Sequence, residues 1–193
     1  MVYLYYIGML VKVASVANYG LKAVDIDVEV NVAEKGFPGF QVVGLANKAV
    51  EEAKERVKTA IINSEIEFPV AKITINLAPA DLPKEGAYYD LPMAVGILGA
   101  SANIKIPDTK SYFYGEVSLD GSLRHSRGVF LMAILAKEQN VKDIYVPRLC
   151  ANEASVIEGI NVYPIDNLKS LIEHLNGTKT IEPLKTINSQ DLF

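Results

Sequence analysis

The sequence predicts a two-layer α/β fold in which a mixed sheet packs against helices. Two observations indicate this class. Three strand-like runs and one long helical pattern come first, and strand and helix patterns then alternate to about residue 177. Elements in this order pack as helices on a sheet. With 193 residues, half of them hydrophobic, the chain is long enough to bury a sizeable core.

The first two strands are predicted to pair with each other. Residues 10–16 are a short β run, and residues 24–32 alternate apolar and polar side chains, which is typical of a strand with one wet face. The turn signal Asn18-Tyr19-Gly20 between them favours an antiparallel pair. A third strand, residues 40–43, is predicted to end at Gly44.

A long helix is predicted from Asn47 to about Asn63. Asparagine is a favourable N-cap because its side chain accepts a hydrogen bond from the first turn. Glu52 and Arg56 lie four residues apart, which predicts an ion pair on the outer face. We interpret this charged face as solvated, and a partner surface is the alternative.

The rest of the chain is predicted to alternate strands and helices. The expected strands are residues 71–77, 112–119, 143–146 and 160–163, and the expected helices are residues 91–102, 129–139, 150–157 and 168–176. Asp120-Gly121 indicates a tight hairpin turn, and Gly177 indicates the end of the last helix. Polar, aperiodic residues from 178 to 193 are typical of a linker.

Composition narrows the class of protein. A net charge of −4 and a pI near 5.3 argue against a strongly basic nucleic-acid surface, although a local basic patch remains compatible with them. The single cysteine, Cys150, cannot form an internal disulfide, which favours a reducing cytoplasm, and we interpret it as a buried apolar residue. No window approaches 18 apolar residues, so no membrane span and no membrane partner are expected.

The first eight residues are apolar, but they lack the basic region and cleavage site of a signal peptide. We interpret Met9 as the usual start and residues 1–8 as an upstream extension.

Motifs for the common cofactors are missing from the sequence. No Gly-Lys pair occurs, so the sequence contains no P-loop motif. It contains no GxGxxG or GxSxG motif either. The two histidines, His125 and His174, have no zinc-ligand spacing around them. We therefore expect neither a cofactor nor a metal ion in this chain.

Four basic residues form the one candidate contact site for a phosphate or an acidic partner. They lie in loops that we expect to meet at one end of the sheet: Lys84, Arg124, His125 and Arg127. The alternative is that they are solubilising charges, with an ion pair to Glu85 or Asp90.

Eight short segments together form a family signature. They are residues 9–13, 36–45, 49–52, 56–61, 74–86, 89–92, 115–121 and 127–129. In these segments the chain resembles the YifB/ComM family of magnesium-chelatase-like AAA+ ATPases, also called competence protein ComM. The resemblance covers roughly residues 9–175.

The resemblance implies three parts: the extension at residues 1–8, an N-terminal domain at residues 9–177, and a linker at residues 178–193 toward an AAA+ module. That module would bind ATP and Mg²⁺. The resemblance further implies a cytoplasmic, hexameric ring that drives DNA branch migration in natural transformation and recombination. Within the ring this domain would help assembly or guide DNA. A magnesium-chelatase-type subunit is an alternative.

The signature loop also resembles the Lon protease domain. This implies a left-handed βαβ crossover, which departs from the usual rule. Lon uses a serine that is activated by a lysine. In this chain Tyr88 occupies the serine position and Phe130 the lysine position. The resemblance therefore implies a non-catalytic domain, and the alternative is a peptidase that uses Ser118 or Ser126.

Overall fold

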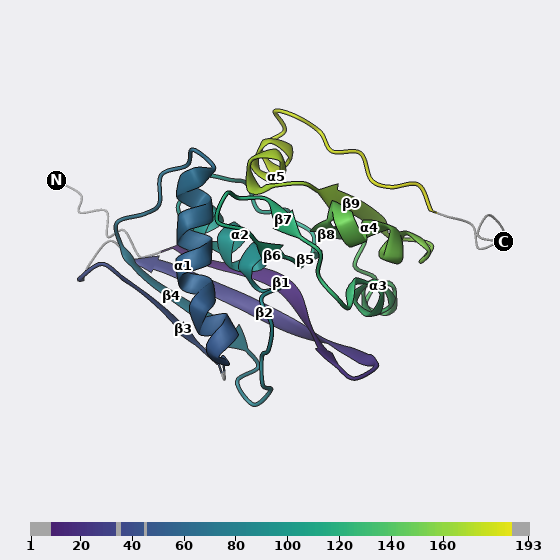
Figure 1. Ribbon diagram of the computed structural model, residues 1–193, viewed down its shortest axis with the longest axis horizontal. Coiled ribbons are helices and arrows are strands. Elements are labelled where there is room, and N and C mark those ends of the chain that lie inside the picture. The colour runs from purple at the N-terminus through teal and green to yellow at the C-terminus, as the bar shows by residue number, and fades with distance from the viewer. Residues whose placement is uncertain (1–8, 34–35, 45, 187–193) are drawn as a thin grey trace.

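A computed structural model describes residues 9–33, 36–44 and 46–186 (Figure 1). The predicted extension at residues 1–8 and the last part of the predicted linker lie outside the described residues. The main sheet has seven strands in the order β3-β4-β2-β1-β5-β8-β9, and β6 and β7 form a separate pair. Both parallel and antiparallel neighbours occur in the main sheet, which confirms a mixed α/β fold.

A long hairpin forms the centre of the main sheet. β1 (Met9–Tyr19) pairs antiparallel with β2 (Lys22–Ala33) along its whole length, as predicted. From Ile26 to Val32 every second side chain of β2 is buried, because successive side chains point to opposite faces of a sheet. The pairing of β2 with β4 reaches only from Asp27 to Ala33, so the turn of the hairpin projects beyond the other strands (Figure 1).

The segment from β3 to β4 contains the crossover of the fold. β3 (Gly39–Val43) and β4 (Lys72–Ala78) are parallel, and α1 (Lys48–Asn63) connects them. The predicted N-cap is confirmed: the Asn47 side chain accepts a hydrogen bond of 3.1 Å from the Val50 amide. This is the crossover to which the resemblance assigns a left hand.

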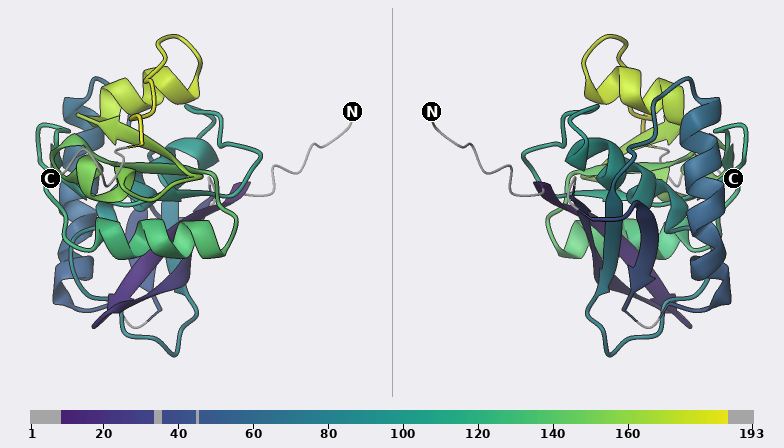
Figure 2. Two further views of the ribbon diagram at one scale, coloured as in Figure 1. Left: turned by 90° about the vertical axis from the view of Figure 1, so that its right-hand side faces the viewer. Right: turned by 90° about the vertical axis from the view of Figure 1, so that its left-hand side faces the viewer.

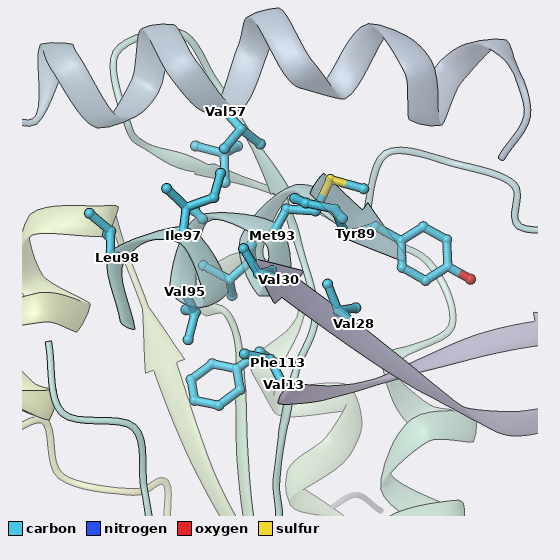
Figure 3. Packing of buried hydrophobic residues seen from close by; sticks show 14 of the residues in the cluster. Val13, Val28, Val30, Val57, Tyr89, Met93, Val95, Ile97, Leu98 and Phe113 are labelled. Carbon is cyan, nitrogen blue, oxygen red and sulfur yellow. The ribbon is translucent and has the colours of Figure 1, made fainter. Parts of the chain in front are cut away.

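α2 (Asp90–Ala100) lies in the middle of the core, and all of its residues are buried. It packs across β1 and β2, with α1 on its outer side (Figure 3). A Cβ atom on Gly96 would lie 2.4 Å from Val30 Cγ2, so this glycine allows the helix to approach β2 closely. The small residues predicted for this helix therefore serve close packing on the sheet.

Two more helices cover part of the opposite face. α3 (Val129–Glu138) and α4 (Arg148–Ser155) bury a second hydrophobic cluster with β8 (Asp143–Pro147) and β9 (Asn161–Ile165). The two-layer arrangement thus holds over β3 and β4, and α3 and α4 form a third layer over part of the remaining strands. α5 (Leu168–Leu175) and the β1–β2 hairpin lie at opposite ends of the molecule (Figure 2).

The structure divides the strand that was predicted for residues 112–119. β5 (Ser111–Phe113) belongs to the main sheet, whereas β6 (Glu116–Val117) pairs with β7 (Leu123–Arg124). The chain leaves the sheet at Tyr114-Gly115, where the Gly115 amide donates to the Tyr88 carbonyl at 2.9 Å. This departure brings the β6–β7 pair over the start of α2.

The segment after α5 runs along the last strand of the sheet. The Leu184 amide donates to the Val162 carbonyl at 2.8 Å, and the Ile181 amide donates to His174 Nδ1 at 3.0 Å. Residues 178–186 of the predicted linker therefore contact β9 and α5.

Candidate functional site

The loop between β4 and α2 carries the position at which the Lon resemblance places a nucleophile. Tyr88 lies there, and its ring stacks on Tyr114 with centroids 4.5 Å apart and tilts against Tyr89 at 4.7 Å. Burial raises the pKa of all three phenols above the ordinary value. A neutral, stacked phenol is a poor nucleophile, so this position is closed by packing instead of being open to a substrate.

Tyr114 joins the Tyr88 loop to the beginning of α3. Its hydroxyl accepts from Asn18 Nδ2 at 2.8 Å and donates to the Arg127 carbonyl at 2.7 Å. Gly128 has φ +91°, and a Cβ atom there would lie 2.1 Å from Asn18 Nδ2, so any other residue would displace this amide. Sequence patterns do not reveal this role of Asn18 and Tyr114, because the two residues lie 96 positions apart.

Phe130, at the position that the resemblance assigns to the lysine, lies on the first turn of α3. Its side chain is 41% exposed and apolar. It supplies no amine that could take a proton from a nucleophile at Tyr88.

The two serines considered as alternative nucleophiles already have structural partners. Ser118 Oγ accepts from Arg124 Nε at 2.6 Å. Ser126 is buried; its Oγ accepts from the Glu116 amide at 3.1 Å and donates to the Arg124 carbonyl at 3.3 Å. Neither contact involves a histidine or lysine that could act as a general base.

The structure corrects the prediction for Lys84. Its side chain is fully buried, and its ammonium group donates to the Pro79 carbonyl within the same loop. Burial lowers the pKa of this ammonium group. Lys84 therefore closes its own loop and does not present its charge at the surface. The alternative ion pair with Glu85 or Asp90 is also not formed.

The other predicted basic residues do lie at the surface. Arg124 is 3.8 Å from Glu116, and His125 Nε2 is 3.2 Å from Glu153. Arg127 is exposed and has no ion pair within the described part of the chain. The part of the basic cluster that remains accessible is thus Arg124, the last residue of β7, together with His125 and Arg127 in the segment that leads to α3.

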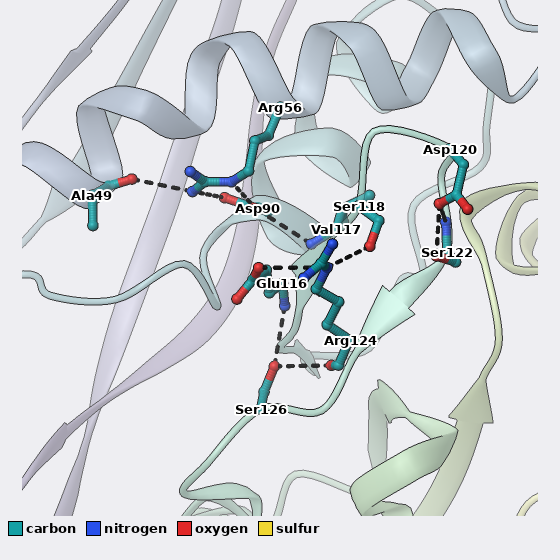
Figure 4. Close-up of polar contacts among 10 residues, drawn as sticks. All are labelled: Ala49, Arg56, Asp90, Glu116, Val117, Ser118, Asp120, Ser122, Arg124 and Ser126. Carbon is teal, nitrogen blue, oxygen red and sulfur yellow. Dashed lines mark hydrogen bonds and ion pairs between the residues drawn. The ribbon is translucent and has the colours of Figure 1, made fainter.

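A buried ion pair that sequence reasoning missed lies beside this segment (Figure 4). Arg56 Nε and Nη2 donate to the two carboxylate oxygens of Asp90 at 2.8 and 3.0 Å, and Asp90 is fully buried. The predicted pair of Glu52 with Arg56 is wrong, since Glu52 is 3.7 Å from Lys48 instead. An i,i+4 rule detects only partners on the same helix.

The Asp90 carboxylate links three elements. It accepts from α1 through Arg56, begins α2, and accepts from the Val117 amide in β6 at 3.3 Å. Burial raises the pKa of Asp90 to about 6, although Arg56 acts in the opposite direction. The pair therefore positions elements: its carboxylate is fully buried, and only the Arg56 side chain is partly exposed to solvent.

Two further features, a metal-binding cluster and a membrane-spanning helix, are absent from the described residues. Among them, no three side chains of His, Cys, Asp or Glu are grouped so that they would hold a metal ion. Nor does that part of the chain contain a helix long and apolar enough to cross a membrane.

Comparisons with known proteins point to one family. The family model described as "Subunit ChlI of Mg-chelatase" matches residues 28–149. The chain is 41% identical to competence protein ComM of Haemophilus influenzae over 90% of its own length and 34% of the relative. It is 42% identical to YifB of Escherichia coli over 86% of its length and 33% of the relative.

A more distant similarity concerns the fold. The chain is 24% identical to Lon protease 1 of Borreliella burgdorferi over 88% of its length and 22% of that protein. This agrees with a Lon-like fold. The chain spans about a third of the length of the ComM and YifB relatives that it matches.

Proposed function

Because the chain belongs to the ComM/YifB family and carries its Mg-chelatase-like domain, we propose that it is a non-catalytic N-terminal domain of an AAA+ ATPase. In this proposal the domain helps the motor to assemble into a ring or guides DNA to it. The curated relatives are about three times as long, which leaves room for a motor module in them.

The observation that carries the non-catalytic role is the closed tyrosine cluster. Tyr88 fills the nucleophile position by stacking on Tyr114, and Phe130 supplies no base. ATP and Mg²⁺ would be bound by the motor module. A role in natural transformation is proposed from the name of the H. influenzae relative, competence protein ComM. Branch migration, a hexameric ring and a cytoplasmic location are proposed from the family resemblance.

A serine-directed covalent probe tests the non-catalytic role. We expect no labelling of the wild-type chain and none of the Tyr88→Ser variant, because Phe130 stands at the position that the resemblance assigns to the lysine and supplies no amine to activate the new hydroxyl. Labelling would be read by intact-protein mass spectrometry. Labelling of the wild type that is lost in Ser118→Ala or Ser126→Ala would establish the peptidase alternative.

DNA guidance has its own test at the accessible arginines. We expect Arg124→Gln with Arg127→Gln to weaken binding to forked DNA and to reduce the slope of log affinity against log salt by about 2, one for each lost phosphate contact. Fluorescence anisotropy at several salt concentrations measures both. Lys84→Gln is no control here because it would disturb a buried loop; Lys137→Gln on α3 is suitable. An unchanged slope would remove these arginines from the DNA path.

The description of the matching family model favours one other candidate, a subunit of magnesium-chelatase type. That role requires a complex with a porphyrin-binding partner. Two results with the full-length protein would together favour the motor role. The protein would fail to stimulate metal insertion with such a partner, and DNA would stimulate its ATP hydrolysis.

A further inference from the structure

Three exposed large apolar side chains lie around one groove. The groove has a volume of about 690 Å³ and lies between α1, the segment from Ile66 to Ala71, and the beginning of β3. Val70 is 84% exposed and Ile62 is 50% exposed on its lining, and Phe37, which directly precedes the lining residue Pro38, is 95% exposed. Exposed apolar patches of this kind mark interaction sites in soluble proteins.

The edge of the sheet beside the groove is also unpaired. β3 is the outermost strand, and its only partner among the described strands is β4. The Gly39 amide donates toward β4, so by alternation the peptide groups of Phe40 and Val42 face outward. An apolar groove next to an open strand edge can hold an extended or hairpin segment of a partner.

A complementary feature lies at the other end of the same molecule. Leu21, at the turn between β1 and β2, is 90% exposed, and Lys22 follows it. β2 runs from this turn to Ala33, which pairs with Lys72 beside the groove, so the two features are separated by about 36 Å. The hairpin and the connection from α1 to β4 project in opposite directions (Figure 1).

The charges at the groove and at the β1–β2 turn also favour contact between these two surfaces. Among the rim residues, Lys54 already pairs with Glu51 at 2.6 Å, and Lys58 lies over the Phe68 ring. Glu55 and Glu67 have no ion pair in the described residues, and neither has Lys22 at the turn. Lys58 has no ion pair in the described residues either, so the unpaired charges of the groove are two acidic and one basic, a small acidic excess, and the unpaired charge of the hairpin turn is basic.

We propose that the β1–β2 turn of one copy of this chain inserts Leu21 into the α1–β3 groove of a second copy, with Lys22 beside Glu55 or Glu67. The contact is head-to-tail, because the two surfaces differ and lie at opposite ends. Repetition of such a contact closes a ring when the rotation allows it. The inference rests on the ring-assembly part of the proposed function and names the surfaces that would perform it.

Sedimentation velocity of single and mixed variants tests the contact. We expect the wild-type chain to self-associate with rising concentration, and Leu21→Asp and Val70→Asp each to weaken association about tenfold or more. An equimolar mixture of the two variants keeps one intact pair of surfaces. It should form a dimer and no larger species.

Two further variants check that association depends on the turn and the groove themselves. Leu149→Asp, on α4 and 70% exposed, is the matched control and should associate as the wild type does. Lys22→Glu should weaken association, and Lys22→Glu with Glu55→Lys and Glu67→Lys in one chain should restore it. Thermal melting of every variant confirms that each is folded.

Three results would overturn the proposal. The first is a wild-type chain that is monomeric up to about 1 mM, the weak end of specific binding. The second is loss of self-association in Val70→Asp but not in Leu21→Asp, which would mean that another segment fills the groove. The third is a mixture that fails to associate, which would indicate a symmetric contact. None of these bears on the serine-directed probe, so the non-catalytic role is judged separately.

Discussion

Replacing Arg56 with methionine is expected to lower the free energy of unfolding by about 3–5 kcal/mol, because it leaves the Asp90 carboxylate buried and unpaired. Urea denaturation followed by circular dichroism measures the change. Lys54→Met is the matched control on the same helix: Lys54 pairs with the more exposed Glu51, so its loss should cost less than about 1 kcal/mol.

The loss in Arg56→Met should also depend on pH. Asp90 already has a folded-state pKa raised to about 6, above its unfolded value, and removal of Arg56 raises it further. A carboxyl group of this kind binds protons more tightly in the folded state, so its contribution to stability falls as pH rises above the unfolded pKa of about 4. The variant should therefore lose most stability near pH 7 and less near pH 4.

A double variant shows whether the buried charge is the cause. Arg56→Met with Asp90→Asn removes the charge but keeps an oxygen that can accept from the Val117 amide. It should recover a large part of the lost stability. A loss equal to that of the single variant at every pH would mean that Arg56 acts through packing alone.

Replacing Gly44 with alanine is the second change with a large expected effect. Gly44 has φ +100°, and a Cβ atom there would lie 2.3 Å from the Leu77 carbonyl oxygen. That oxygen belongs to the backbone of β4, so no side-chain rotation can relieve the overlap. We expect a loss of at least about 3 kcal/mol in the free energy of unfolding.

Gly20→Ala separates the two causes of that loss. Gly20 also has a positive φ of +57°, but a Cβ atom there would meet nothing within 4 Å. It should cost only the backbone term of about 1–2 kcal/mol. Equal losses at the two positions in urea denaturation would show that contact with Leu77 contributes nothing.

The elements that were predicted correctly share a local cause. The alternation in β2 and the N-cap at Asn47 depend on residues that are close in sequence, and both are present in the structure. The strand predicted for residues 112–119 was wrong at its centre. Nothing local in Tyr114-Gly115 reveals that the Gly115 amide bonds to Tyr88, 27 positions away.

The candidate site shows the same difference between features that are local in sequence and contacts between distant residues. The resemblance led to Tyr88 and Phe130, but their surroundings came from Asn18 and Tyr114, which lie on other strands or connections. Lys84 was expected at the surface because lysine usually is, yet the loop folds over its side chain. The proposed DNA contact at Arg124 and Arg127 stays a prediction.

The sequence by itself determined the family, the α/β class, and most of the strands and helices. Signature segments, side-chain periodicity and helix caps all depend on residues that are close together in the sequence. Only the tertiary structure decided that Asp90 is the partner of Arg56, that Tyr88 is packed shut against Tyr114, and that a groove and a hairpin lie at opposite ends. These are contacts between distant parts of the chain, and burial, which sets their strength, exists only once the chain has folded.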